Sequence, residues 1–117
     1  MDCARAEGEA SGGLLRFGCA VRNTGAADGD EVVMVFHVAG EDVRARVRDA
    51  HPVPARSLVG FERARIAAGS VANLEFRLGE AALALVNATG GRQLYAGQHA
   101  LVFSRGHGPE VAVNVTV

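Results

Sequence analysis

Acidic side chains and histidines are the groups of this chain whose chemistry would support catalysis. Paired carboxylates perform general acid–base and nucleophilic chemistry, and histidine titrates near neutral pH. The four histidines have no metal-ligand spacing and no Ser or Cys partner motif; they are His37, His51, His99 and His107. The acids fall mostly in expected turns or at outward strand positions, and no motif selects a pair from Asp28, Asp30, Glu31, Glu41, Asp42, Asp49, Glu62, Glu75, Glu80 and Glu110. We therefore predict no catalytic residue, no metal site and no cofactor in this chain.

The two cysteines, Cys3 and Cys19, are the next chemically distinctive residues. A hairpin centred near Ser11 would place them directly opposite each other on one face, so a disulfide is geometrically feasible. It would close a loop of ~15 residues and stabilise the fold by about 3 kcal/mol, provided that the compartment is oxidising. The alternative is a pair of small buried thiols. Two cysteines without further Cys or His spacing do not form a zinc site.

Two Asn-X-Thr sequons are candidate N-glycosylation sites, at Asn87 and Asn114. Glycosylation of such sequons requires an exposed acceptor in a secreted protein. Asn87 falls in an expected hairpin turn, which makes it the better acceptor, whereas Asn114 falls on the outward face of an expected strand.

Length and composition predict one domain over residues 1–117. The chain has 49% hydrophobic residues and a formal net charge of −1, so it has enough apolar material for a core and no general affinity for polyanions such as nucleic acid. No apolar run approaches the ~18 residues of a membrane span. The first residues, Met1–Arg5, lack the apolar stretch of a signal peptide, so the chain is either cytosolic or a piece of a longer protein.

Short apolar runs separated by Gly-rich turns predict an all-β antiparallel sandwich of seven or eight strands. In Leu14–Asn23 one face carries Leu15, Phe17, Cys19 and Val21. Period-two alternation of this kind is typical of half-buried strands. Further strands are expected at 1–8, 31–39, 57–64, 70–78, 98–104 and 111–117, with a helical turn near 79–85 and a hairpin turn over 86–92.

The strand expected over 31–39 is apolar on both faces. One face of an antiparallel sandwich sheet normally contacts water. The second face, formed by Val32, Met34, Phe36 and Val38, is either covered by a loop of this domain or docks against another domain or subunit.

Within the long connection 40–56, apolar residues alternate with Arg44, Arg46 and Arg48. This alternation predicts a short strand with an all-arginine outer face. The arginines either bind an anionic partner or neighbouring domain, or protect a sheet edge against pairing.

An ordered series of motifs carries a family resemblance. The series is Val-Arg-Asn-Thr-Gly at 21–25, Asp-Gly-Asp-Glu-Val-Val at 28–33, Leu-Val-Gly-Phe-Glu-Arg at 58–63, Ala-Gly-Ser at 68–70 and Tyr-Ala-Gly-Gln-His at 95–99. It resembles the C-terminal fibronectin type III-like domain of family 3 glycoside hydrolases from about residue 14 to residue 117. Leu-Ala-Leu-Val-Asn at 83–87, followed by Gly-Gln-His at 97–99, looks closest to the β-xylosidase/α-arabinofuranosidase branch. The apolar Met34 and Phe36 and the alternating arginines depart from the family pattern.

The resemblance implies an immunoglobulin/fibronectin type III-like β-sandwich that serves as a non-catalytic module of a secreted β-xylosidase or β-glucosidase. In that family the nucleophile and the acid/base lie in other domains, which would be this module's partners. A second hypothesis is a free-standing extracellular module that binds copies of itself, or mediates adhesion, through its apolar face. Direct carbohydrate binding is weaker, because sugar platforms use exposed aromatic rings and this chain has no Trp and one Tyr.

Overall fold

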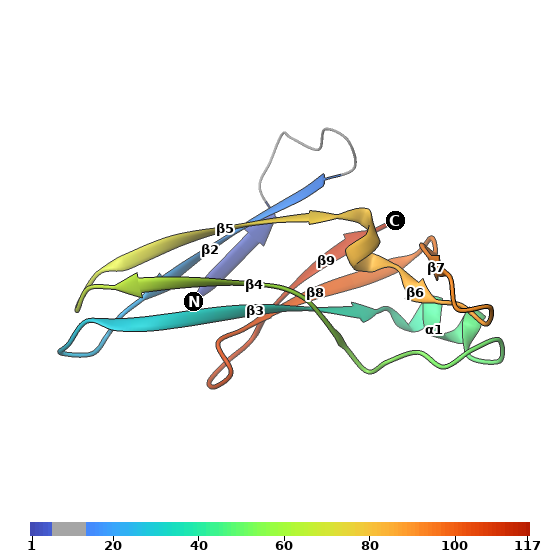
Figure 1. The fold of residues 1–117 in the computed structure, drawn as a ribbon, viewed down its shortest axis with the longest axis horizontal. Coiled ribbons are helices and arrows are strands. Elements are labelled where there is room, and N and C mark those ends of the chain that lie inside the picture. Colours follow the sequence, from blue (N-terminus) through green and yellow to red (C-terminus); the bar gives the residue numbers. More distant parts are fainter. Residues whose placement is uncertain (6–13) are drawn as a thin grey trace.

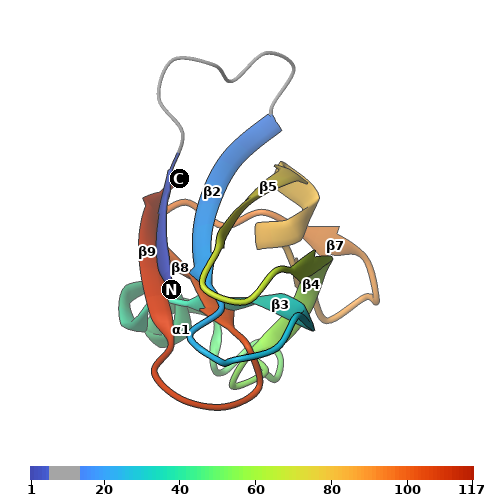
Figure 2. The same ribbon diagram turned by 90° about the vertical axis from the view of Figure 1, so that its left-hand side faces the viewer.

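Residues 1–5 and 14–117 are described by the structure, a computed structural model, and they form two facing antiparallel sheets (Figures 1 and 2). One sheet has the order β1-β2-β5, with β1 at Asp2–Arg5, β2 at Leu14–Arg22 and β5 at Val71–Gly79. The second has the order β4-β3-β8-β9, with strands at Ser57–Ile66, Gly29–Ala39, Gln98–Ser104 and Val111–Thr116. The predicted antiparallel β-sandwich of the fibronectin type III-like class is confirmed. The turn expected near Ser11 lies outside the described residues.

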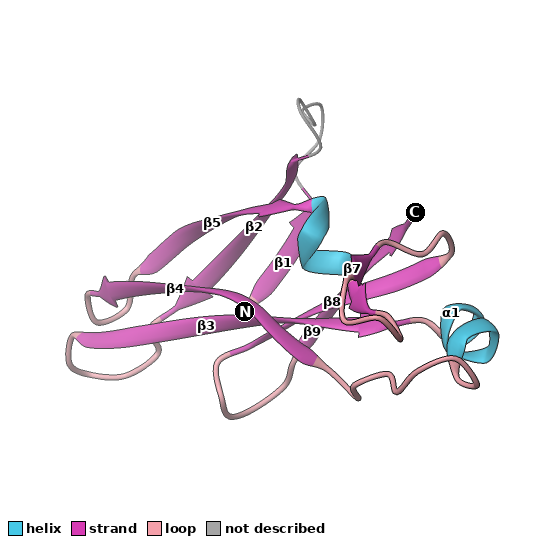
Figure 3. Ribbon diagram, turned by 45° about the vertical axis from the view of Figure 1, so that its right-hand side comes forward, coloured by secondary structure: helices cyan, strands magenta, loops and turns pink. Residues whose placement is uncertain are grey.

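Three smaller elements complete the described part of the chain (Figure 3). Helix α1 spans Glu41–Val47, a 3-10 helix spans Glu80–Leu83, and a short hairpin pairs β6 (Leu85–Val86) with β7 (Arg92–Gln93). Helix α1 follows β3 at one end of the sandwich (Figure 1). The helical turn and the hairpin were both expected in these places.

The core lies between the two sheets and is centred on three phenylalanines. Phe17 of β2 and Phe76 of β5 approach Phe103 of β8, with ring centroids 5.7 Å and 5.3 Å away. All three rings are buried. The alternation in β2 places Leu15, Phe17, Cys19 and Val21 inside, as the period-two pattern predicted.

Asn23, at the end of β2, holds two loops together. Its side-chain amide donates to the carbonyls of Ala27 and Ile66, at 2.9 Å and 2.8 Å, and its Oδ1 accepts from the N–H of Gly25. Its backbone also bonds Ser70 and Gly69 of the turn after β4. The Asn-Thr-Gly motif and the distant Ala-Gly-Ser motif are therefore one structural unit, because the side chain and the backbone of Asn23 together fix both turns.

The strand predicted around Arg44, Arg46 and Arg48 is wrong, because this segment forms helix α1. Val43 and Val47 are four residues apart and are both buried, which is the spacing of one helical face. The same two valines also fit an alternating pattern, so the period alone was ambiguous. Acidic residues in the first helical turn favour the helix, since they complement the positive end of its dipole.

Two glycines allow α1 to pack tightly against the start of β8. The N–H of Gly40 donates to the Gln98 carbonyl at 2.7 Å, and a Cβ on Gly40 would collide with that carbonyl. Gly97 has a φ of +136°, in the region that side-chain-bearing residues rarely adopt. Close approach at the first site and backbone conformation at the second therefore both require glycine.

Candidate interaction surface

The outward side of the four-stranded sheet is apolar over much of its area. In β3, Val33, Val35 and His37 point into the core, whereas the alternate residues Val32, Met34, Phe36 and Val38 are half-buried. The register continues this apolar character across the sheet, because Phe36 lies opposite Val102 and Val38 opposite Ala100. The structure therefore brings together the four β3 residues that the sequence placed on one face.

The most exposed part of this face comes from β4. Phe61 lies opposite Met34 and Leu58 lies opposite Phe36, with exposed fractions of 66% and 56%. We call Met34, Phe36, Leu58 and Phe61 the apolar outer face. The alternation in the sequence predicted no surface role for Leu58 and Phe61. A register shift between Val35 and Phe36 decides which β4 residues face outward, and pairing register is not visible in one sequence.

An ion pair covers one part of the apolar outer face. The Arg56 guanidinium carbon lies 4.2 Å from the centroid of the Phe36 ring, and its nitrogens bind the Glu110 carboxylate at 3.2 Å. The hydrogen bond from Arg56 lowers the pKa of Glu110, more than desolvation raises it. Phe36 is thus shielded by a cation–π contact, whereas Phe61 and Leu58 remain open to solvent.

The arginines of α1 mostly bind the chain itself. Arg44 donates to the carbonyls of Ala39, Pro54 and Ala55 at 2.8–3.1 Å, and thereby holds the loop after α1 against the end of β3. Arg46 donates to the Ala96 carbonyl, and Arg48 pairs with Glu41 at 2.8 Å on the surface. These three arginines therefore do not form an arginine stripe beside the apolar outer face.

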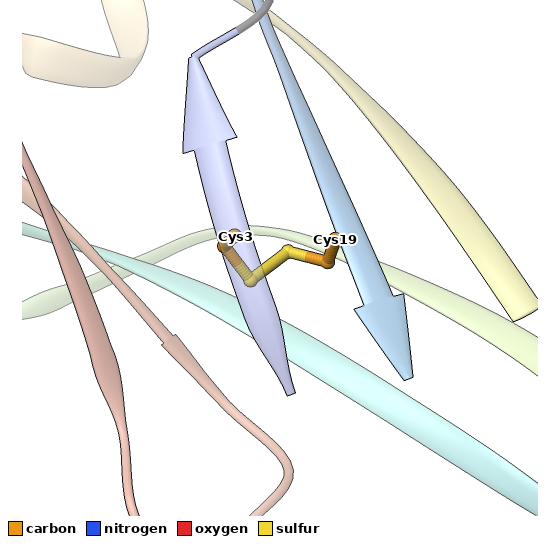
Figure 4. The surroundings of a disulfide bond; sticks show 2 residues. All are labelled: Cys3 and Cys19. Carbon is orange, nitrogen blue, oxygen red and sulfur yellow. A yellow bond between two sulfur atoms is a disulfide. The ribbon is translucent and has the colours of Figure 1, made fainter. Parts of the chain in front are cut away.

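Cys3 and Cys19 are joined by a disulfide (Figure 4). They are direct partners in the β1–β2 register, with Cα atoms 4.1 Å apart. The predicted hairpin placed the two cysteines opposite each other, and the structure has this register. The bond ties the four-residue strand β1 to the interior strand β2.

The two sequons occupy different environments. Asn87 lies in the β6–β7 turn, where its Oδ1 accepts from the N–H groups of Thr89 and Gly91 and its Nδ2 donates to Gln93 at 3.3 Å. Asn114 is exposed on β9, opposite Ala100, and therefore lies on the outward side of the four-stranded sheet.

Three of the four histidines are buried. His37 Nε2 and His99 Nδ1 are 2.9 Å apart, and His99 Nε2 is 2.8 Å from the Tyr95 carbonyl. Burial, followed by the charges of His99 and Arg44, lowers the pKa of His37 to about 4. His51 bonds the Tyr95 hydroxyl at 2.9 Å, and His107 is exposed. These contacts hold loops and strands together.

Residues 1–5 and 14–117 contain neither a metal-ligand cluster nor a membrane-spanning helix. No three His, Cys, Asp or Glu side chains in these ranges gather to hold a metal ion. No helix in the same ranges is both long enough and apolar enough to cross a bilayer.

Comparison with known proteins agrees with the geometry. Residues 31–105 match the family model described as a fibronectin type III-like domain. A comparison with curated protein sequences finds no match.

Known structures share the fold at low sequence identity. A β-glucosidase from intestinal bacteria, involved in saponin metabolism, has a TM-score of 0.79 at 16% identity, over 99% of this chain and 15% of its own. The β-glucosidase DesR from Streptomyces venezuelae, in complex with D-glucose, has a TM-score of 0.72 at 23% identity, over 97% and 15%. A β-glucosidase from Listeria innocua with bound glucose has 0.71 at 19%, over 88% and 13%. This chain therefore spans about one seventh of those proteins, and by its match to the family model it belongs to the fibronectin type III-like domain family.

Proposed function

We propose that this chain is a non-catalytic accessory domain of a family 3 glycoside hydrolase, and that it docks on the catalytic domains through the apolar outer face. The observation that carries this proposal is the coverage: the fold matches nearly all of this chain but only 13–15% of each β-glucosidase. The ordered motifs that resemble the C-terminal domain of that enzyme family support the same assignment.

The apolar outer face supplies the docking surface in this proposal. Docking would bury Phe61 and Leu58, which are mostly exposed in the chain alone. Burial of a large apolar side chain contributes about 1.5–3 kcal/mol, so two such residues form a credible centre for an interface. The Arg56–Glu110 pair at one side would form part of a polar rim.

The finer assignment is a secreted β-xylosidase or β-glucosidase, closest to the β-xylosidase/α-arabinofuranosidase branch. The motifs at 83–87 and 97–99 support the branch. The Cys3–Cys19 disulfide and the Asn87 sequon support secretion, since disulfides persist in oxidising compartments. A glycan on Asn114 would project from the outward side of the docking sheet, so the proposal expects Asn87 to be the acceptor.

The second candidate function is a free-standing extracellular module that binds copies of itself or mediates adhesion. The observation that favours it is again the exposure of Phe61 and Leu58, because an open apolar patch also fits a second copy. The two candidates differ in the partner that covers the patch.

Expression of the complete reading frame tests the proposal. The expected product hydrolyses an aryl β-xyloside or β-glucoside, and Phe61→Asp lowers the thermal unfolding midpoint of its catalytic part. Val71→Asp is the matched control, because Val71 is also an exposed apolar residue but lies on β5 of the other sheet. A reading frame without glycosidase domains, or equal effects of the two variants, would contradict the proposal.

A further inference from the structure

A cavity of about 660 Å³ lies between the beginning of β4 and the segment that joins the 3-10 helix to β7. Its wall is mainly apolar and includes Val59 and Leu85. Leu58 and Val86 also line it, and both are more than half exposed. The volume and the apolar lining are those of small-molecule sites, in which a few polar groups fix the orientation of the ligand.

One of the polar groups in this lining is the buried imidazole of His37, which is 2% exposed. The Tyr95 carbonyl can only accept, so His99 donates to it from Nε2, which leaves its Nδ1 as the acceptor in the contact with His37. His37 must therefore donate from Nε2 to His99, which leaves its own Nδ1 as an unprotonated acceptor. Among the described residues, no group bonds this Nδ1.

The His37 ring is uncharged at neutral pH. Burial, His99 and Arg44 lower its pKa to about 4, so Nδ1 keeps its lone pair under ordinary conditions. A ligand with a hydroxyl donor satisfies this atom, whereas a ligand that only accepts hydrogen bonds does not.

The charge of the lining favours an acid. None of the described residues that line the cavity is Asp or Glu, and the cationic side chain among them is Arg92. Arg92 is exposed, and the one hydrogen bond of its side chain to the described residues is a long contact of 3.4 Å to the Ala81 carbonyl. Its guanidinium is thus available to a carboxylate at the rim.

We propose that this cavity binds a small hydroxylated aromatic acid, with its hydroxyl on His37 Nδ1, its ring against Val59 and Leu85, and its carboxylate near Arg92. A rigid aromatic ring buries apolar area with little loss of conformational entropy, and a phenol is a stronger donor than an aliphatic alcohol. The proposal goes beyond the accessory role and does not rest on the glycosidase assignment.

The test is titration of the 117-residue chain with 3-(4-hydroxyphenyl)propionate, followed by calorimetry and amide NMR. We expect saturable one-site binding, with shifts concentrated in residues 57–59 and 82–92. The analogue without the hydroxyl should bind about fivefold more weakly, because His37 Nδ1 then loses its donor. The methyl ester should bind about threefold more weakly, because an exposed arginine adds a modest charge interaction.

Two variants locate the site. Ala84→Phe places a ring in the cavity and should weaken binding at least tenfold, whereas Ala112→Phe on β9 should leave binding unchanged, since Ala112 does not line the cavity. Arg92→Gln should weaken binding of the acid but not of the ester.

Three results would overturn the proposal. The first is no saturable binding of the acid to the folded chain, and the second is equal affinity for the acid, the deoxy analogue and the ester. The third is a titration in which an apolar protein segment, such as part of the catalytic domains, shifts the amide resonances of residues 82–92 while the acid does not. The cavity would then be a docking groove for protein.

Discussion

At the residue scale, the His37–His99 pair is a polar contact buried in the core. Each of the two residues is only 2% exposed, and a single hydrogen bond joins their rings. A proton added to His37 would place a charge in the core beside the His99 imidazole and near Arg44. Burial therefore favours the neutral form of His37 in the folded chain.

This constraint predicts that the domain loses stability in mild acid. The pKa of His37 is lowered from 6.5 to about 4, so the unfolded chain binds more protons between these values and the free energy of unfolding falls as the pH decreases. The full loss from this group is about 3 kcal/mol, complete near pH 4. Urea unfolding at pH 7.0 and at pH 4.5 measures it.

NMR of the histidine rings separates this effect from the titration of carboxylates. The His37 ring resonances should stay constant down to about pH 5, because the pKa of this ring is lowered to about 4. A His37 ring that titrates near pH 6.5 in the folded chain would contradict the account of the pair.

Also at the residue scale, Arg44 and Arg48 should differ in their effect on stability. Arg44 donates to three carbonyls, whereas Arg48 forms an exposed ion pair with Glu41. Arg44→Ala should lower the free energy of unfolding by about 1.5–3 kcal/mol, because charged hydrogen bonds are lost. Arg48→Ala should change it by less than about 0.5 kcal/mol, since exposed pairs contribute little.

Denaturant unfolding of the two variants at neutral pH measures this difference. If both variants changed the free energy of unfolding by the same small amount, Arg44 would behave as a surface residue. That is the behaviour expected of an all-arginine strand.

At the scale of elements, the strands could largely be predicted and α1 could not. Val43 and Val47 satisfy both an alternating and a helical period, and the alternating arginines favoured the strand interpretation. What decides for the helix is tertiary: Asp42 accepts hydrogen bonds from Gln98 N–H and Val43 N–H, and Arg46 reaches the Ala96 carbonyl. The contacts with Gln98 and Ala96 join segments that are 56 and 50 residues apart, and one sequence does not reveal them.

The outward side of the sheet was only half predictable for the same reason. Alternation in β3 correctly grouped Val32, Met34, Phe36 and Val38. The contribution of Leu58 and Phe61 depends on the register of β4 against β3 and on its irregularity beside Phe36. The cavity beside His37 likewise depends on loops packed from separate parts of the chain.

The disulfide gives a prediction that belongs to strand β1. Removing it should lower the free energy of unfolding by about 3 kcal/mol. The cysteines are 16 residues apart, and without the bond the unfolded chain is no longer closed into this loop and gains conformational entropy. The Cys3→Ala/Cys19→Ala double variant, compared with the wild type by urea unfolding, measures the loss.

The reduced wild type is the control for the double variant. It should unfold at nearly the same urea concentration as the double variant, and reductant should leave the double variant unchanged. An unchanged midpoint on reduction of the wild type would show that β1 is held by other contacts.

At the scale of the whole molecule, the sandwich has a closed core and one outward side with exposed apolar residues. The three phenylalanines fill the space between the sheets, whereas Phe61 and Leu58 face solvent on the outward side. Proteins that share this fold over 13–15% of their length place such a domain within a much larger chain. We therefore propose that the apolar outer face contacts the rest of a larger chain.

Sedimentation velocity of this chain mixed with the separately expressed remainder of its reading frame tests that claim most directly. We predict a monomeric chain at all concentrations when alone, a one-to-one complex in the mixture, loss of the complex with Phe61→Asp and its retention with Val71→Asp. A chain that oligomerises alone through Phe61, or a complex that Phe61→Asp leaves intact, would contradict the account.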